Sequence, residues 1–493
     1  MTWMVGLRTE YRPSWRLYSA VAVAALAPRL ILIFLVPQAY GDASAYLHVA
    51  ENIFRNFCVS LSDPATGECV PHWGGNQLPG YPAFIALVWA VAGESLTAVR
   101  IAQAFAVSIA IVWMSHAVGR LSGSPRAALL AGLVLALSPL AVAWPRHLFT
   151  ETLALATTIW VFAELVLSIS QGRLRLLPLA LALAGAIFIR HDAVWLCLPV
   201  ALCGFLIHPP LTAVRRGAIL ILIMAVPLGG WWVRSISAGL APFPFSVLAS
   251  GERYPAGYLA WANTWSTNEY QLAGWAFPMN LYAYSNIQID GPKAYGDSAE
   301  EARVTALLDR LAAFDGQPFP SDVDEAFAAL ARERQSQDPL RYWLWLPVKR
   351  AAMMWGNPFT SVGWPTASEP NSGVPPEVLQ DLVDRGIIGA LPLIAKYPSL
   401  AAYKALTTGY RLALLAVAAF LLALSWGPAL REVRVIIWLA AAYAVGRTAF
   451  FSFFFLNSTR FIIEAAPALE IAAVLGLMVL WQSWRRGSAA RVE

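Results

Sequence analysis

The chain has 493 residues, of which 58% are hydrophobic and only 13% are charged. Soluble globular proteins carry about 25% charged residues. This composition therefore excludes a disordered chain, a secreted disulfide scaffold and an ordinary cytosolic enzyme, and it predicts a multi-pass membrane protein. The net charge of +5 does not indicate nucleic-acid binding, because the arginines lie at the ends of apolar segments, where the positive-inside rule places them.

Ten apolar runs are candidate membrane spans, since about 20 apolar residues are needed to cross the hydrocarbon core. They cover 17–37, 96–119, 126–144, 150–169, 174–190, 192–208, 216–236, 404–427, 433–456 and 461–484. No small-residue cleavage site follows the first run, so it is expected to be a retained helix. Residues 80–93 and 342–356 are shorter and are expected to form interfacial helices. The fold class predicted is an all-α polytopic membrane protein.

Arginine placement predicts the orientation of these spans. Arginines precede the first span, fill every second connection and follow the last span: Arg8, Arg12, Arg16, Arg120, Arg126, Arg173, Arg175, Arg215, Arg216, Arg431, Arg434, Arg485, Arg486 and Arg491. With ten spans and both termini cytoplasmic, all of them face the cytoplasm. The outer face then carries the connections 38–95, 145–150, 190–192, 237–403 and 457–460. Within 237–403, helical patterns are expected at 298–314 and 322–338.

Polar residues gather in these outer connections. They are Asp42, Tyr46, His72 and Tyr81 in the first, Arg146, His147 and Glu151 in the second, Arg190, His191 and Asp192 in the third, and Arg460 and Glu464 near the last span, with Arg447 inside the ninth. Charges at a membrane boundary are costly, so they indicate a function or a partner. Carboxylates beside cations suit activation of a nucleophile and electrostatic holding of an anionic leaving group. A lipid phosphate ester has the matching chemistry.

Each of the acidic residues also has a purely structural interpretation. Asp42 is a favoured residue type for capping a helix over 43–55. Glu151 opens a span, where the helix dipole favours an acid. Arg190 and Asp192 are also consistent with an ion pair that joins two helix ends.

The remaining polar residues have structural alternatives too. Arg460 and Glu464 have the spacing of a pair on one helix. Arg447 is also consistent with snorkelling to the interface. His72 and His147 are consistent with ordinary loop residues, and no His/Cys spacing resembles a zinc site.

The cysteines and aromatic residues permit two further predictions. Cys58 and Cys69 lie in the first outer loop, where an oxidising compartment favours a disulfide, whereas Cys197 and Cys203 are expected to be packing residues. Most of the 21 tryptophans are expected to be interfacial anchors. An aromatic cluster in the middle segment is either structural or a surface that stacks on sugars or covers a lipid: Tyr258, Trp261, Trp265, Tyr270 and Trp275.

Several of these motifs resemble the GT-C membrane glycosyltransferases, in the branch that contains the protein O-mannosyltransferases and the lipid A aminoarabinose transferase. The motifs are Gly41-Asp42-x-x-x-Tyr46, Pro79-Gly80-Tyr81-Pro82, Thr150-Glu151, Arg190-x-Asp192 and Arg460-Phe461 followed by Pro467. The resemblance covers 16–235 well and 430–480 more loosely. It implies a bundle of about ten (10–13) transmembrane helices with interfacial helices in the first extracytoplasmic loop.

The resemblance also implies functions for the segments and residues. Residues 1–236 would form a catalytic transmembrane module, 237–403 an extracytoplasmic acceptor region, and 404–493 C-terminal transmembrane helices. Asp42 would be the catalytic base and Arg460 a ligand of the donor phosphate, with Arg190 and Arg146 as further candidates. Ala43 replaces the acid that follows the aspartate in protein O-mannosyltransferases, and no Asp-x-Asp pattern follows, so neither protein mannosylation nor a metal is favoured.

The resemblance therefore implies a glycosyltransferase that needs no cofactor and uses a polyprenyl-phosphate sugar. Asp42 would deprotonate an acceptor hydroxyl of a glycan, lipid or protein in a single displacement on the outer face. The Ala-, Arg- and Leu-rich composition suggests a bacterial inner membrane with a periplasmic site. A multi-pass flippase or transporter of lipid-linked sugars is the alternative, although such folds often show two related halves; a non-catalytic assembly scaffold is a third.

Overall fold

A computed structural model describes residues 14–35, 43–60, 62–71, 78–240, 254–267, 269–280, 282–289, 293–357, 391, 395, 398–453 and 459–489. Their regular structure is helical, and the pairing of Ser60 with Pro71 is an isolated bridge outside any named strand. The all-α fold class is therefore confirmed for the described residues. The chain divides into two compact units, one drawn from 1–242, 361–444 and 463–493 and the other from 243–360 and 445–462. We call them unit 1 and unit 2.

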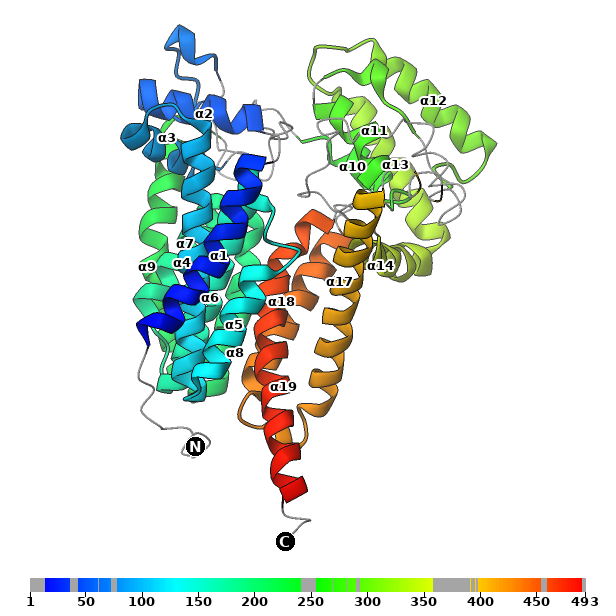
Figure 1. The fold of residues 1–493 in the computed structure, drawn as a ribbon. Helices are drawn as coiled ribbons and strands as arrows, with labels where there is room; N and C mark the ends of the chain where they lie inside the picture. Colours follow the sequence, from blue (N-terminus) through cyan, green and yellow to red (C-terminus); the bar gives the residue numbers. More distant parts are fainter. Residues whose placement is uncertain are drawn as a thin grey trace. The chain divides into compact units, whose positions relative to one another are not determined.

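Unit 1 is a bundle of long helices with shorter ones at its ends (Figure 1). Its elements are α1 (Trp15–Leu35), α2 (Ala43–Asn56), η1 (Pro64–Thr66), α3 (Gly80–Ala92), α4 (Leu96–Ser122), α5 (Pro125–Leu137), η2 (Trp144–Arg146), α6 (Glu151–Gln171), α7 (Leu176–Ile189), η3 (His191–Leu196), α8 (Cys197–Ile207), α9 (Pro210–Ser237), α17 (Pro398–Leu424), η7 (Pro428–Leu430), most of α18 (Arg434–Phe453), η9 (Ile463–Ala465) and α19 (Ala466–Ala489).

A helix stands at each of the ten apolar runs predicted to span the membrane. Seven helical stretches among the described residues are long and apolar enough to cross it: α1, α4, α6, α9, α17, α18 and the stretch Thr459–Arg485 that contains α19. The helices at the other three runs, α5, α7 and α8, are shorter, and the count of ten spans stays a prediction. The predicted interfacial runs 80–93 and 342–356 are also helical, at α3 and at η6 with α14.

Helix α6 lies at the centre of unit 1. Of its most apolar window, 89% is buried, the largest share among the seven candidate spans. It packs against α4, α7 and α19, and α4 in turn contacts α1 and α5. Helix α6 begins at Glu151 and ends before Gly172, which adopts the left-handed conformation. The two charged regions described below lie at these two ends of the helix.

Sequence signals explain where the bundle turns. The Ser95 and Ser124 side chains accept hydrogen bonds from the N–H groups of Ala98 and Ala127 at the starts of α4 and α5, as N-cap serines do. Gly80 permits a close approach between helices, because a Cβ there would lie 2.6 Å from the backbone of Phe188 in α7. The glycine of the Pro-Gly-Tyr-Pro motif thus lets α3 rest on the last turn of α7.

Unit 2 has its own aromatic core. Its elements are α10 (Ala256–Ala262), α11 (Glu269–Asn280), η5 (Tyr284–Asn286), α12 (Ser298–Ala312), α13 (Ser321–Gln337), η6 (Arg341–Trp345), α14 (Leu346–Gly356), the last turns of α18 and η8 (Thr459–Phe461). Helices α12 and α13 stand where the sequence predicts helical patterns at 298–314 and 322–338.

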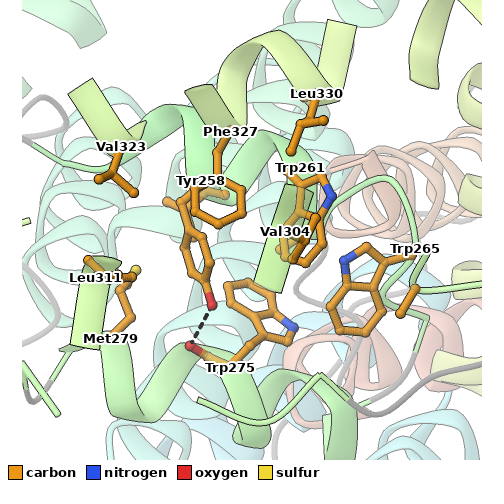
Figure 2. Packing of buried hydrophobic residues seen from close by; sticks show 14 of the residues in the cluster. Tyr258, Trp261, Trp265, Trp275, Met279, Val304, Leu311, Val323, Phe327 and Leu330 are labelled. Carbon is orange, nitrogen blue, oxygen red and sulfur yellow. Dashed lines mark hydrogen bonds between the residues drawn. The ribbon is translucent and has the colours of Figure 1, made fainter. Parts of the chain in front are cut away.

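The core of unit 2 settles how four of its aromatic residues are used. Tyr258, Trp261, Trp265 and Trp275 are at most 1% exposed and pack against Phe327, Leu311 and Met279 (Figure 2). The idea that these four rings stack on sugars or cover a lipid is therefore wrong, because they are enclosed by their own unit. The side chain of Tyr270 lies outside the described residues.

Candidate functional site

The centre of the candidate site is Arg190, which follows the last residue of α7 in an extended conformation. Its Nε and Nη2 atoms donate to the two carboxylate oxygens of Asp192, at 3.0 and 2.9 Å. Its Nη1 atom lies 3.1 Å from a carboxylate oxygen of Glu151 and 3.2 Å from the Thr150 hydroxyl oxygen. Its Nε atom is 3.2 Å from a carboxylate oxygen of Glu464. One guanidinium therefore contacts three carboxylates.

These contacts join three parts of unit 1. Glu151 opens α6, Asp192 lies in η3 between α7 and α8, and Glu464 lies in η9 just before α19. The Arg190 side chain is 11% exposed, and the three carboxylate side chains are at most 2% exposed. Charges buried this deeply are tolerated only when paired and hydrogen-bonded. The arginine therefore fixes the three helix ends relative to one another.

Two of the structural alternatives concern ion pairs between these residues. Arg190 and Asp192 do form the ion pair that joins two helix ends, and Glu151 and Glu464 belong to the same set. Arg460 and Glu464 do not share one α-helix, because residues 459–461 and 463–465 form separate 3₁₀ turns. Glu151 and Glu464 are therefore joined to Asp192 by their contacts with Arg190.

A second group of buried residues holds the turn that carries Arg146 and His147. Both are at most 1% exposed, in and after η2. The Gln103 amide in α4 donates to the carbonyl oxygens of Pro145, at 3.2 Å, and of His147, at 3.0 Å. The hydroxyl of Tyr81 in α3 donates to the Gln103 oxygen at 2.9 Å. Gln103 therefore sets the course of this turn.

Gln103 is a positioning residue that the sequence interpretation missed. A signal for it exists, since a polar side chain inside the apolar run 96–119 is costly unless it has a task. Thr150, which contacts Arg190, belongs to the Thr150-Glu151 motif. Tyr46 and Tyr81 are buried and meet edge to face, with ring centroids 5.2 Å apart, so they pack α2 against α3.

The first loop is stabilised by the predicted cysteine pair. Cys58 and Cys69 form a disulfide with Cα atoms 6.0 Å apart, and the Asn52 amide donates to the carbonyl oxygens of Ser60, at 3.1 Å, and Ser62, at 2.8 Å. Asp42 and His72, two of the predicted site residues in this loop, lie outside the described residues. Asp42 immediately precedes Ala43, the buried first residue of α2, and its catalytic role stays a prediction.

Two predicted residues, Arg447 and Arg460, belong to unit 2. Arg447 is fully buried, its Nε atom donates to the Phe461 carbonyl oxygen at 2.5 Å, and its guanidinium lies 5.2 Å from the centre of the Phe451 ring. The snorkelling alternative is thereby excluded. Arg460 lies in η8, the short turn that follows α18 in sequence.

Further charged residues that the sequence interpretation did not single out are buried within candidate spans, and three of them show how such charges are held. Arg29 in α1 donates to the carbonyl oxygens of Ala25 and Ala136. Glu470 in α19 accepts from the Ser138 and Tyr410 hydroxyls at 2.6 and 2.7 Å, and Glu164 in α6 pairs with Arg175. Each has internal partners, which is typical of structural charges. Among the described residues, no group of three or more His, Cys, Asp or Glu side chains is arranged to hold a metal ion.

Comparison with known proteins identifies a family over part of the chain. Residues 76–231 match the model of the family described as dolichyl-phosphate-mannose-protein mannosyltransferase. That segment contains the Pro-Gly-Tyr-Pro motif, Gln103, the η2 turn, Glu151 and the Arg190–Asp192 pair. This part of the chain is therefore similar to a family of mannosyltransferases. A comparison of the sequence with curated proteins finds no match.

Solved structures offer only distant likenesses. An oligosaccharyltransferase from Archaeoglobus fulgidus aligns at 10% identity and a TM-score of 0.45, over 98% of this chain and 52% of its own. ArnT from Cupriavidus metallidurans, solved with undecaprenyl phosphate, aligns at 14% identity and a TM-score of 0.37, over 94% of this chain and 77% of its own. The arabinosyltransferase EmbB from Mycobacterium smegmatis aligns at 15% identity and a TM-score of 0.33, over 89% of this chain and 42% of its own. The chain thus spans about half the length of the archaeal enzyme.

Proposed function

We propose that this protein is a membrane glycosyltransferase, which transfers a sugar from a polyprenyl-phosphate donor to a hydroxyl group of a glycan, lipid or protein. The observation that carries the proposal is the family match over 76–231, within which Arg190 gathers Glu151 and Asp192 at one end of the helix bundle. The donor tail would lie in the bilayer and its phosphate at the bundle end. Such tethering turns a diffusive encounter into a held one.

The reaction we propose is a single displacement. The Asp42 carboxylate accepts the proton of the acceptor hydroxyl, and the hydroxyl oxygen attacks the anomeric carbon. The bond from that carbon to the phosphate oxygen breaks, and polyprenyl phosphate leaves with the bonding electron pair. Inversion of the anomeric centre follows from one displacement. In this scheme no cofactor or metal takes part.

The arginines have different roles in this scheme. Arg460 and Arg146 would hold the charge that develops on the leaving phosphate, as fixed cations do at a transition state. Arg190 already contacts three carboxylates, so a phosphate reaching it would share its N–H groups with them. We therefore give Arg190 a positioning task in addition to phosphate binding: it holds the starts of α6, η3 and α19 in register.

The location we propose follows from the arginine pattern of the sequence. The end of the bundle that carries Arg190 would face the periplasm of a bacterial inner membrane, and both termini would be cytoplasmic. The region 237–403, whose described residues fall largely in unit 2, would bind the acceptor.

The test is an assay of the purified protein with a radiolabelled polyprenyl-phosphate hexose and membrane extract as acceptor. Release of polyprenyl phosphate by the wild type, abolished in Asp42→Asn at equal expression, is the expected result. Asp63→Asn is the matched control, because Asp63 caps η1 in the same loop and is exposed. Undiminished release by Asp42→Asn would eliminate Asp42 as the base. Binding of the lipid without release of any of several sugars would favour the flippase alternative.

A further inference from the structure

A second charged region lies at the other end of α7. The α6–α7 connection and the first turns of α7 and α9 enclose a cavity of about 550 Å³. Four arginines line it: Arg173 and Arg175 from the connection, and Arg215 and Arg216 from α9. Arg190 follows the last residue of α7, and a 14-residue helix is about 21 Å long. This cavity is therefore distinct from the candidate site.

The positive charge of the cavity is only partly balanced within the protein. Arg175 pairs with Glu164 at 3.0 Å and lies over the Trp113 ring. Arg173, Arg215 and Arg216 make no ion pair with any residue that the structure describes. Guanidinium groups that converge on one concavity repel one another unless an anion lies between them. The cavity thus has the charge of an anion-binding site.

The apolar part of the lining indicates what kind of anion fits. Leu174, Leu176 and Ile219 line the cavity beside the arginines. Along the same two helices, Leu181 of α7 and Leu222 of α9 are more than half exposed, as lipid-facing residues of candidate spans are. An anion that continues into hydrocarbon chains would satisfy both the guanidinium groups and this apolar surface.

We propose that this cavity binds the phosphate headgroup of an anionic phospholipid. Arginine suits the task because its planar fork matches phosphate oxygens in a bidentate way, and basic pockets between transmembrane helices bind such headgroups. The volume lies in the usual range for a small-molecule site. Simple enrichment of arginine at one membrane face would not require convergence: Arg120 and Arg126, at the neighbouring α4–α5 turn, do not line the cavity.

Free phosphate and polyprenyl phosphate share this chemistry, so the experiment separates the three sources. Purified, delipidated full-length protein is titrated in detergent with phosphatidylglycerol, phosphatidylcholine, inorganic phosphate and polyprenyl phosphate, and binding is followed by native mass spectrometry. Wild type is compared with Arg215→Gln/Arg216→Gln and with the matched double variant Arg120→Gln/Arg126→Gln. Arg216→Lys keeps the charge without the fork and provides a second variant.

The expected result is selective binding of phosphatidylglycerol over phosphatidylcholine, weakened about 30-fold in Arg215→Gln/Arg216→Gln and unchanged in the Arg120/Arg126 control. Arg216→Lys should bind at an intermediate strength. Equal binding by wild type and both double variants would overturn the proposal. The proposal would also be overturned if inorganic phosphate bound as tightly as phosphatidylglycerol. The same holds if polyprenyl phosphate displaced phosphatidylglycerol from the wild type but did not bind the Arg215→Gln/Arg216→Gln variant. Unaltered melting of the lipid-free variants excludes misfolding as the cause.

Discussion

The two ends of α7 use arginine in opposite ways. At its C-terminal end one arginine, Arg190, contacts three carboxylates and is almost fully buried. At its N-terminal end four arginines line one cavity, and one carboxylate, Glu164, pairs with one of them. The first arrangement is buried and joins helix ends. In the second, Arg173 and Arg215 are exposed and Arg175 and Arg216 are partly buried.

This contrast separates a structural arginine from one that is available to a ligand. A buried guanidinium bound by carboxylates from several helices fixes those helices, and removing it leaves buried negative charges. Partly exposed guanidinium groups that share a cavity contribute little to folding, because exposed charges are screened by water and salt. Their substitution should instead change what the protein binds.

Arg190→Ala should be the most damaging substitution of a single arginine. It leaves the carboxylates of Glu151, Asp192 and Glu464 without the guanidinium that they share, and breaking a buried ion pair in this way costs about 3–5 kcal/mol. The measurement is the midpoint of thermal unfolding in detergent, followed by tryptophan fluorescence. Arg173→Ala, at the other end of α7, should change stability by no more than about 0.5 kcal/mol.

Arg190→Lys sharpens the result. A lysine keeps the charge but not the bidentate contact with Asp192, so its melting midpoint should lie between those of wild type and Arg190→Ala. If Arg190→Ala and Arg173→Ala melted at the same temperature, the contrast between the two ends of α7 would fail.

Gln103→Leu should have the next largest effect. It leaves the Tyr81 hydroxyl and the Pro145 and His147 carbonyl oxygens without the Gln103 amide, and the loss of such a buried partner costs about 1–3 kcal/mol. Tyr81→Phe removes only the hydroxyl and should cost less. Because Gln103 sets the course of the η2 turn, we also expect Gln103→Leu to lose transfer activity beyond its loss of stability. If Gln103→Leu and Tyr81→Phe were equally stable, the η2 turn would be held by other contacts.

Local features of the fold follow from the sequence, and long-range contacts do not. Helices stand at all ten apolar runs because hydrophobic length is a property of consecutive residues, and Arg190 and Asp192 are two residues apart and pair as one alternative suggested. Glu464, in contrast, reaches Arg190 from the far end of the chain. No spacing in the sequence predicts that contact, because it depends on how α19 packs against α6.

The same limit explains one error of interpretation in the aromatic residues and one feature that the arginine pattern does not predict. Trp261 and Trp265 look like interfacial or sugar-binding residues in sequence, yet packing by α12 and α13 encloses them. Arg173 and Arg215 look like ordinary cytoplasmic charges, yet the pairing of α7 with α9 brings them to one cavity. In each case tertiary packing, not residue type, decides the role.

The smallest expected effect is a pH dependence at the arginine-rich end of α7. His208, between α8 and α9, accepts a hydrogen bond from the Leu174 N–H at its Nε2 atom, 3.4 Å away. Burial, and after it the charge of Arg216, lowers the pKa of His208 below its ordinary value of 6.5. The folded state therefore prefers neutral His208, whereas the unfolded chain takes up a proton near pH 6.5. Stability from this group is complete above that pH and is lost as the pH falls below it.

Lipid-free wild type should therefore show a small decrease in melting temperature between pH 7.5 and 5.5 that His208→Gln lacks. Arg216→Gln should reduce the decrease, because it removes a positive charge that opposes protonation. Phosphatidylglycerol should also reduce this decrease in melting temperature in wild type, since a phosphate in the cavity would favour the imidazolium form of His208. The lipid should have no such effect in Arg215→Gln/Arg216→Gln. An identical pH dependence in wild type and His208→Gln would assign the decrease to other groups.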